Sequence, residues 1–257
     1  MSQVMTTENP DTPPQESFMS HLLELRNRLV KAALAILIIF LALSPFMKHI
    51  FDLLSHPLMV ALPAGTKLLS TGVIAPFMVP LKVTLFVAFV LALPIVLYQV
   101  WAFVAPGLYQ HERRLAAPVI ISSVFMFLLG MTYCYFIVFK MVFAFIAGFA
   151  PASVSVAPDI EAYFGFVLSM FLAFGLAFEV PVVVVLLVKL GMVSVEKLKD
   201  IRGYVIVGAF IIAAIFTPPD VASQLLLAIP LCILYELGII ASRFVGKPRR
   251  RGDAASE

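Results

Sequence analysis

Glutamates occur at three points of the sequence where a carboxylate could do chemistry: Glu24, Glu112 and Glu179. Glu24 lies in the segment SHLLELRNRL and Glu112 in YQHERR, and both segments are basic with apolar flanks. A carboxylate in such a place can hold the cation of a partner, or it can pair with its own neighbours. The local alternative is an i,i+4 pair of Glu24 with Arg28 and a solvated loop around Glu112. Exposed pairs of this kind contribute only about 0.3–0.5 kcal/mol and are common.

Glu179 differs from the other two because it lies inside a long apolar run, in the segment FEVP. An ionisable side chain within a membrane span costs about 2.5–3.5 kcal/mol on insertion scales, so it faces protein or water and is a functional candidate. The alternative is a structural hydrogen bond to a neighbouring helix. Pro181, two residues later, lacks a backbone donor and predicts a bend in the helix at this point.

No motif for catalysis is present in the sequence. It contains no HExxH zinc-protease pattern, no GxSxG nucleophile elbow, no P-loop and no dinucleotide fingerprint. The four histidines lie outside the apolar runs without metal-pair spacing, and Cys134 and Cys232 lie inside apolar runs, as small buried hydrophobes do. We therefore expect no enzyme activity, no cofactor and no metal site.

The composition decides the class of protein that carries these glutamates. Of 257 residues, 62% are hydrophobic and 13% are charged, and the mean hydropathy is +1.04. A soluble domain of this length cannot bury so much apolar surface, so the chain is predicted to be an integral membrane protein. A disordered chain, a disulfide-rich secreted scaffold and most soluble enzymes are excluded, and the net charge of +3 gives no support to nucleic-acid binding.

Apolar segments within residues 17–242 predict six transmembrane helices in one domain, because a helix needs about 20 apolar residues to cross a hydrocarbon core. They cover residues 29–47, 76–101, 115–140, 163–188, 203–216 and 221–240. Residues 1–16 form a polar, Pro-containing tail without a signal-peptide pattern, and residues 243–257 form a basic tail. The fifth helix would rise only about 21 Å, which local thinning of the membrane can accommodate.

Segments at the membrane surface carry further expectations. Leu22, Leu25 and Leu29 share one helical face, which predicts an amphipathic helix at the interface. Residues 49–75 predict a loop folded over the membrane surface. Lys82 lies near the end of a span and can snorkel to the interface, and Glu236 can reach toward Arg243.

The placement of Lys and Arg predicts the orientation. Most of them flank the spans on one side, before the first, between the second and third, between the fourth and fifth, and after the last. The opposite side has only Lys48, Lys67 and Lys140, with Lys82 close by. The positive-inside rule then puts both termini in the cytoplasm, in agreement with an even number of spans.

Several long stretches of the chain closely resemble the TatC family, a subunit of the twin-arginine protein translocase. They are SHLLELRNRL (20–29), APFMVPLK (75–82), PIVLYQVWAFVAPGLYQHERR (94–114), FGLAFEVPVVVVLL (174–187), YVIVGAF (204–210) and TPPDVASQLLLAIP (217–230). The resemblance covers about residues 17–250. It implies a cupped six-helix bundle of the bacterial inner membrane with short fifth and sixth helices.

By this resemblance the chain is the receptor for signal peptides that bear an Arg-Arg pair and direct folded proteins across the membrane. Glu24 and Glu112 match the family's signal-binding positions, and carboxylates suit this task because Arg grips them through two parallel hydrogen bonds. Arg26 and Arg113 are expected to hold these carboxylates in place, and Phe103 is expected to wall the site.

The remaining site residues follow from the same resemblance. Glu179 matches an intramembrane glutamate that meets a polar residue of a single-helix partner, and Thr217 and Gln224 match a polar patch for partner docking. Supporting roles in loops and packing fall to Pro57, Phe77, Tyr135 and Asp220. Many family members have an acidic residue at the place of Gly72, so this chain departs from the family pattern there.

The expected function is that of a non-enzymatic translocase subunit driven by the proton motive force. Its expected partners are twin-arginine signal peptides, single-helix TatA- and TatB-type subunits, further copies of the chain and membrane lipid, but no nucleic acid. The alternative is a secondary transporter of a small solute or ion centred on Glu179 and Lys82. An intramembrane enzyme ranks lower, because no nucleophile or metal set is evident.

Overall fold

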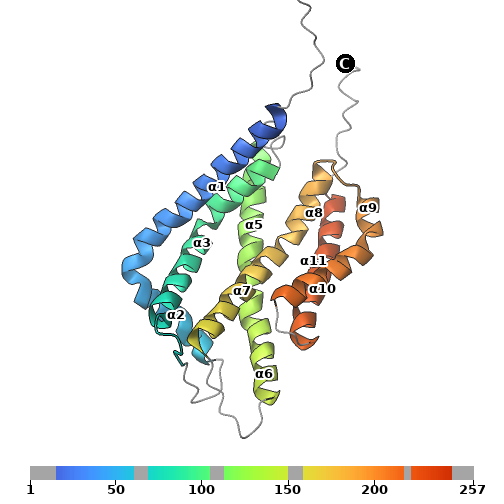
Figure 1. The fold of residues 1–257 in the computed structure, drawn as a ribbon. Helices are drawn as coiled ribbons and strands as arrows, with labels where there is room; N and C mark the ends of the chain where they lie inside the picture. The colour runs from blue at the N-terminus through green and yellow to red at the C-terminus, as the bar shows by residue number, and fades with distance from the viewer. Residues whose placement is uncertain (1–15, 61–68, 105–112, 150–158, 217–220, 245–257) are drawn as a thin grey trace, which may run out of the picture.

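The computed structural model describes residues 16–60, 69–104, 113–149, 159–216 and 221–244, and within these ranges the chain forms helices and no strand (Figure 1). Five helical stretches in this part of the chain are long and apolar enough to cross a membrane, and a further apolar helix is shorter. The predicted class, an all-α integral membrane protein, is confirmed.

The first helix, α1, runs from Glu16–Leu43 without interruption. Its 28 residues span about 42 Å, so the leucine-rich segment 20–29 is the first part of the membrane-crossing helix and not a separate interfacial helix. No Gly or Pro lies within α1 to break it. A 3-10 turn, Ser44–Phe46, contains Pro45 and leads into α2, Met47–Val60.

The long helix α3, Ala75–Val104, packs along α1 and carries Pro80 and Pro94 inside it (Figure 1). The third stretch is a single rod built of α5 (Arg113–Tyr133), a π-helical turn (Cys134–Val138) and α6 (Phe139–Phe149). This rod continues past the predicted end at residue 140. Val142 and Phe143 are buried there, and the Phe143 ring stacks on Tyr163 at 5.6 Å, so tertiary packing extends the helix.

The fourth stretch consists of α7, Ile160–Phe178, and α8, Val180–Lys189, which meet at Glu179. The interruption falls where Pro181 predicted a bend. The α8 helix ends at Lys189 and is followed by Gly191, whose positive φ of 69° suits a residue without a Cβ. The backbone amide of Gly191 donates a hydrogen bond to the carbonyl of Val188, and the amide of Met192 donates one to the carbonyl of Leu187.

The C-terminal part contains α9 (Val195–Asp200), α10 (Arg202–Phe216) and α11 (Val221–Phe244). The length of α10, 15 residues, is close to that of the predicted fifth helix, residues 203–216. The α11 helix has 24 residues and extends beyond the predicted end of the sixth helix at residue 240. Glu236 of α11 does not reach toward Arg243. It pairs instead with Arg202 of α10, Nη2 to Oε2 at 2.6 Å, because the two helices are neighbours.

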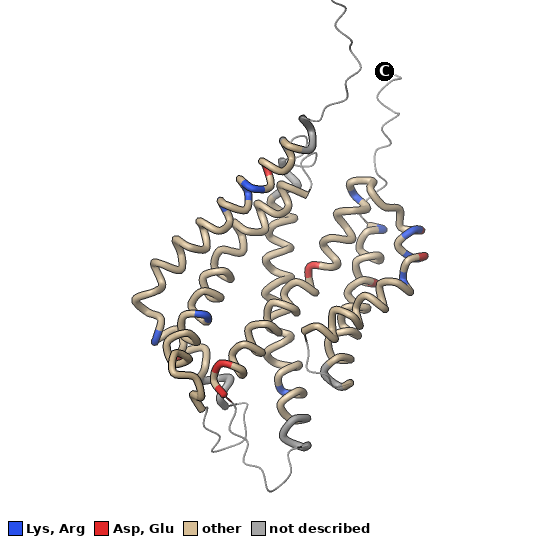
Figure 2. Tube along the Cα trace, viewed as in Figure 1, with Lys and Arg blue, Asp and Glu red and all other residues tan. Residues whose placement is uncertain are grey.

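The largest buried side chains gather around α7, which therefore lies at the centre of the packing. They include Phe164, Val167, Met170 and Phe174, together with Phe139 of α6 and Leu227 of α11. The start of α1 and the end of α11 lie at the same end of the bundle (Figure 1). Charged residues collect toward the ends of the helices and leave most of the middle uncharged (Figure 2). The common end of α1 and α11 agrees with an even number of membrane crossings, and the uncharged middle agrees with a membrane-spanning bundle.

Candidate functional site

Glu24 and Arg28 form the polar centre of the contact between α1 and α3. The Arg28 guanidinium donates from Nε at 2.9 Å and from Nη2 at 2.6 Å to Oε1 of Glu24. Its Nη1 lies 3.4 Å from Oε1 of Gln99 in α3. The Glu24 side chain is 40% exposed and that of Arg28 is 24% exposed, so the pair is open to an approaching ligand.

Toward the start of α1, two aromatic rings pack in the contact between α1 and α3. The His21 imidazole stacks on the Phe103 ring with centroids 4.4 Å apart and planes inclined by 22°. Phe103 is half-buried at the end of α3. Next to the ion pair is an open hollow of about 440 Å³ lined by Leu23, Glu24, Asn27, Arg28 and Lys31.

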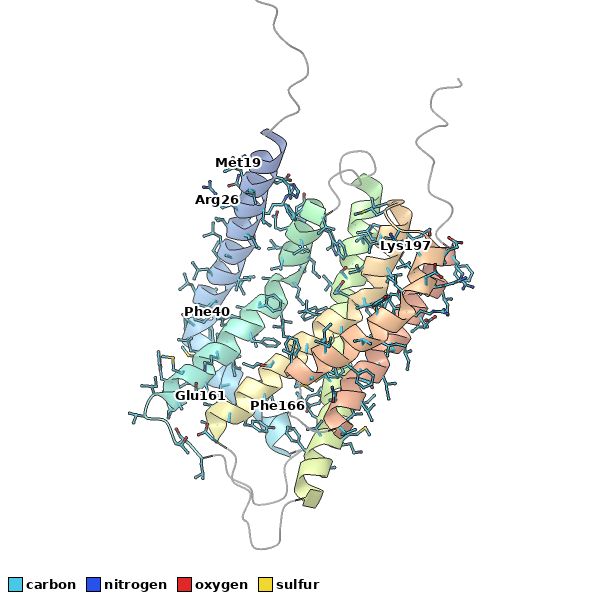
Figure 3. All side chains as sticks on the ribbon, turned by 45° about the vertical axis from the view of Figure 1, so that its right-hand side comes forward. Met19, Arg26, Phe40, Glu161, Phe166 and Lys197 are labelled. Atoms are coloured by element: carbon cyan, nitrogen blue, oxygen red, sulfur yellow. The ribbon has the colours of Figure 1, made fainter. Side chains whose placement is uncertain are left out.

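Arg26 lies on a different side of α1 from Glu24. Its side chain is exposed and projects outward, away from α3 (Figure 3). Residues two apart on a helix do not face each other, whereas residues four apart do, so Arg28 and not Arg26 holds the Glu24 carboxylate. Glu112 lies outside the described residues, and Arg113 is described only as the first residue of α5.

Glu179 is buried at the junction of α7 and α8, with 7% of its surface exposed. Neither of its carboxylate oxygens has a hydrogen-bond partner within the described part of the chain. Nearby, the Trp101 indole N–H of α3 donates to the Ser123 hydroxyl of α5 at 2.8 Å, and this hydroxyl faces the Glu179 carboxylate. Three helices thus bring polar groups together in an otherwise apolar interior, and none of the described residues donates a hydrogen bond of good geometry to the carboxylate.

An apolar groove of about 420 Å³ lies between α5 and α8, beside this polar group. Ser122 lines the groove while its neighbour Ser123 turns inward, and Pro181 and Val182 line it directly after Glu179. The other lining residues are Pro118, Val119, Met126, Val185, Leu186 and Lys189. An apolar helix or chain in this groove would pass close to the buried carboxylate.

Charged and polar side chains also join α3 and α7 at the opposite end of the bundle. Lys82 does not simply extend to solvent, because its Nζ pairs with Oε1 of Glu161 at 2.6 Å. Asp159 caps α7 through the amides of Glu161 and Ala162, at 2.9 and 3.0 Å. Its second oxygen accepts from the Thr71 amide at 3.1 Å and from the Thr71 hydroxyl at 2.6 Å. The hydroxyl bond, followed by the amide bonds, lowers the pKa of Asp159 to about 2.

The other expected residues are dispersed. Gln224 donates from Nε2 to the Phe210 carbonyl at 3.1 Å and so joins α11 to α10. Phe77 is 57% exposed at the start of α3, and Tyr135 is half-buried in the π-helical turn. Pro57 is described only as part of α2, and Thr217 and Asp220 lie outside the described residues.

No group of three potential metal ligands occurs in the part of the chain that the structure describes. Cys134 and Cys232 are free thiols. Cys134 is buried among apolar side chains, as predicted, whereas Cys232 is only partly buried.

Several residues of these sites were not predicted from the sequence as functional. The sequence predicts Arg28 only as a local partner of Glu24, and the structure shows it bonded to Glu24 and next to Gln99. Gln99 and the pair Trp101–Ser123 carried no signal, because their partners lie 71 and 22 residues away and only the fold brings them together.

Comparison with known proteins matches residues 20–230 to the family model of the Sec-independent protein translocase protein (TatC). The chain belongs to the TatC family. Accordingly it is a component of a protein translocase, not a member of a catalytic enzyme family, and a multi-pass protein of the inner membrane.

Individual TatC proteins give the same result. The chain is 49% identical to the TatC protein of Escherichia coli (strain K12) over 242 residues, which cover 94% of this chain and 93% of that one. It is 51% identical to the TatC protein of Halothiobacillus neapolitanus over 232 residues, 90% of this chain, but spans only 63% of that relative's length, less than two thirds. A crystal structure described as the twin-arginine translocase receptor TatC superposes with a TM-score of 0.76 at 38% identity, covering 88% of this chain and 99% of that one.

Proposed function

We propose that this chain is the signal-peptide receptor and core subunit of a twin-arginine translocase. Glu24 and Glu112 receive the arginine pair of the signal peptide, and the translocase then exports the folded passenger across the inner membrane. The observation that carries the proposal is the exposed Glu24 carboxylate, which already holds a guanidinium, that of Arg28, in this structure. A carboxylate that binds one guanidinium through two hydrogen bonds can bind another in the same way.

The contact between Phe103 of α3 and His21 of α1 also supports the proposal. Their stacked rings border the Glu24 pair and offer an apolar surface to the residues that follow an arginine pair in a signal peptide. We assign Arg26 and Arg113 to the recognition surface, where Arg26, exposed and turned away from α3, would contact the precursor or a partner and not Glu24.

The apolar part of the signal is proposed to reach the groove between α5 and α8. Pro181 and Val182, which line this groove, directly follow Glu179 in the chain. The two buried oxygens of Glu179 lack hydrogen-bond partners among the described residues and suit a polar residue of an entering TatA- or TatB-type helix. Thr217 and Gln224 would add to partner docking, and Pro57, Phe77, Tyr135 and Asp220 would support loops and packing. Copies of the chain would associate with one another in a receptor complex.

No chemistry on a substrate is part of this proposal. The energy comes from the proton motive force, since moving one charge across 100 mV yields about 2.3 kcal/mol. Both termini are placed in the cytoplasm, where the binding site would meet precursors before export. The charge distribution and the common end of α1 and α11 support this orientation.

The test is site-specific crosslinking of a twin-arginine signal peptide to membranes that contain the wild-type chain or the variants Glu24→Ala and Glu112→Ala. Both variants should lose crosslinking and the preference for Arg-Arg over Lys-Lys. Glu196→Ala is the matched control, because Glu196 is an exposed glutamate of α9 outside the site. If both site variants crosslink as well as the wild type and keep its preference, the binding assignment is wrong.

A further inference from the structure

The apolar groove between α5 and α8 extends over the depth of about one membrane leaflet. Its walls run from Pro118 to Met126 on α5 and from Pro181 to Lys189 on α8. Each wall rises about 12 Å along its helix, less than half of the hydrocarbon core of about 30 Å. The α8 helix ends, and α5 begins, at the end of the bundle where α1 starts (Figure 1). The groove therefore runs from that membrane surface toward the middle of the bilayer.

The walls of the groove suit an apolar occupant. Pro118 and Pro181 have no backbone N–H to offer. The Ser122 hydroxyl already donates to the Val119 carbonyl at 2.9 Å. The other apolar side chains along the walls are Met126, Val182, Val185 and Leu186. A polar segment in this groove would lose its hydrogen bonds to water and gain few in return, whereas a hydrocarbon chain loses nothing.

Lys189 places a positive charge at the surface end of the groove. It is the last residue of α8 and is half-buried, so its aliphatic stem lines the groove while its ammonium can reach the membrane surface. None of the ion pairs among the described residues includes Lys189. Arg113 and Arg114 begin α5 at the same end of the bundle. Basic groups above a pocket between transmembrane helices are typical of sites for anionic lipid headgroups.

We propose that this groove binds an anionic phospholipid, with one acyl chain between α5 and α8 and the phosphate at Lys189. The inference goes beyond the proposed function, which takes the apolar part of the signal to the same groove, because the lipid is the occupant before a precursor arrives. A lipid fits better than the helix of a partner subunit, which would cross the whole hydrocarbon core and extend far past the groove.

The headgroup charge sets the preference among lipids. An acyl chain that enters the groove leaves one hydrocarbon environment for another, so burial of the chain by itself distinguishes no lipid from its neighbours. An anionic headgroup gains the attraction of Lys189, and a single lysine near a charged membrane surface favours it by about fivefold. The groove should therefore be enriched in anionic lipid over the surrounding bilayer.

The experiment compares two photoactivatable phospholipids with the same diazirine-bearing acyl chain. One has the anionic phosphatidylglycerol headgroup and the other the zwitterionic phosphatidylcholine headgroup. Each is added as a minor component to phosphatidylcholine nanodiscs that contain the full-length protein, and crosslinked residues are identified by mass spectrometry. The anionic probe should label residues 118–126 and 181–189 about fivefold more than the zwitterionic probe. Exposed apolar residues of α1, Leu34, Ile38 and Leu41, serve as the internal reference and should be labelled equally by both.

Variants of Lys189 test the source of the preference. Lys189→Gln should abolish the excess labelling of the groove by the anionic probe, and Lys189→Arg should keep it. Lys197→Gln is the matched control, because Lys197 is an exposed lysine of the nearby α9 that does not line the groove. It should leave the excess unchanged. Val185→Phe narrows the groove and should lower labelling there by both probes, which keeps the test valid if Lys189→Gln does not fold.

Two results overturn the inference on the lipid probes alone: equal labelling of the groove by both probes in the wild type, or an excess that survives in Lys189→Gln. A third comes from p-benzoylphenylalanine in place of Val185. If it crosslinks to another polypeptide in membranes without precursor, a protein and not a lipid fills the groove. None of these readouts depends on the binding of a signal peptide, so failure of the proposed function at Glu24 would leave the lipid site untouched.

Discussion

Gly130 of α5 lies directly against the backbone of Phe174 in α7. A Cβ on Gly130 would overlap the Phe174 carbonyl oxygen and lie 2.9 Å from its carbonyl carbon. On the other side of this crossing, Gly175 of α7 faces the Phe127 ring of α5 with no room for a Cβ. Small residues let membrane helices approach closely, and here they bring α5 against the half of α7 that ends at Glu179.

Gly130→Ala should therefore destabilise the protein, by about 1–3 kcal/mol, because the atoms in the way belong to the backbone and cannot rotate aside. The measurement is the thermal unfolding midpoint in detergent. Gly165→Ala is the control, since a Cβ there has nothing within 4 Å and should leave stability equal or slightly higher. Equal midpoints for Gly130→Ala and the wild type would contradict the close packing of α5 on α7.

Trp101 and Ser123 should be coupled in stability. The indole N–H donates to the Ser123 hydroxyl at 2.8 Å, and both residues are buried, at 5% and 0% exposed. Trp101→Phe and Ser123→Ala each leave one group without its partner, whereas the double variant removes both. A double-mutant cycle on the free energy of unfolding should give a coupling of about 1 kcal/mol. Strictly additive effects would show that this bond contributes nothing to stability.

Glu179 offers a test that separates function from structure. A buried carboxylate without a partner costs stability, so Glu179→Gln should raise the unfolding free energy by about 1–2 kcal/mol. Glu179→Ala should retain crosslinking of the signal peptide but slow export of a folded passenger by about tenfold or more, the equivalent of about 1.4 kcal/mol. Normal export would dismiss the role of Glu179. Reduced stability of Glu179→Gln would favour the structural alternative, a hydrogen bond to a neighbouring helix.

Local signals in the sequence predicted the apolar helices and the break at Glu179, because length, hydropathy and the position of Pro181 are properties of a short segment. The resemblance to TatC named the family, which the comparisons confirm. Contacts between distant segments could not be predicted in this way. Gln99 and Arg28 are 71 residues apart in the sequence and come together only in the fold. The helix continues past residue 140 because Val142 and Phe143 are buried there and the Phe143 ring stacks on Tyr163 of α7. The i,i+4 pair of Glu24 and Arg28 was foreseeable, but only the fold brings Gln99 of α3 next to it.

Asp159 should make stability depend on pH. Its pKa is lowered from 3.8 to about 2, first by the Thr71 hydroxyl and then by backbone amides. A group whose pKa is lowered by folding stabilises the folded state fully above its unfolded pKa, and this contribution is lost as the pH falls through the folded pKa. The difference in unfolding midpoint between the wild type and Asp159→Asn should thus be constant from about pH 7 to 5 and shrink from about pH 4 to 2.

Thr71→Val is the control for this pH effect, because it removes the largest cause of the lowered pKa and keeps the carboxylate. The pH at which stability is lost should move upward in Thr71→Val. A midpoint difference between wild type and Asp159→Asn that stays constant down to pH 2 would refute the role of the Asp159 carboxylate.

Gly72 lies close to the carboxylate of Glu161. A Cβ on Gly72 would lie 4.0 Å from Oε2 of Glu161, whose other oxygen pairs with Lys82 at 2.6 Å. A carboxylate from α7 therefore lies next to the position of Gly72. Gly72→Asp would set two carboxylates side by side and should lower stability relative to the isosteric Gly72→Asn. The loss should stay below about 1 kcal/mol, because the Lys82–Glu161 pair is exposed. It should diminish at high salt, which screens the repulsion. Higher stability of Gly72→Asp than of Gly72→Asn would mean that Lys82 holds both carboxylates at once.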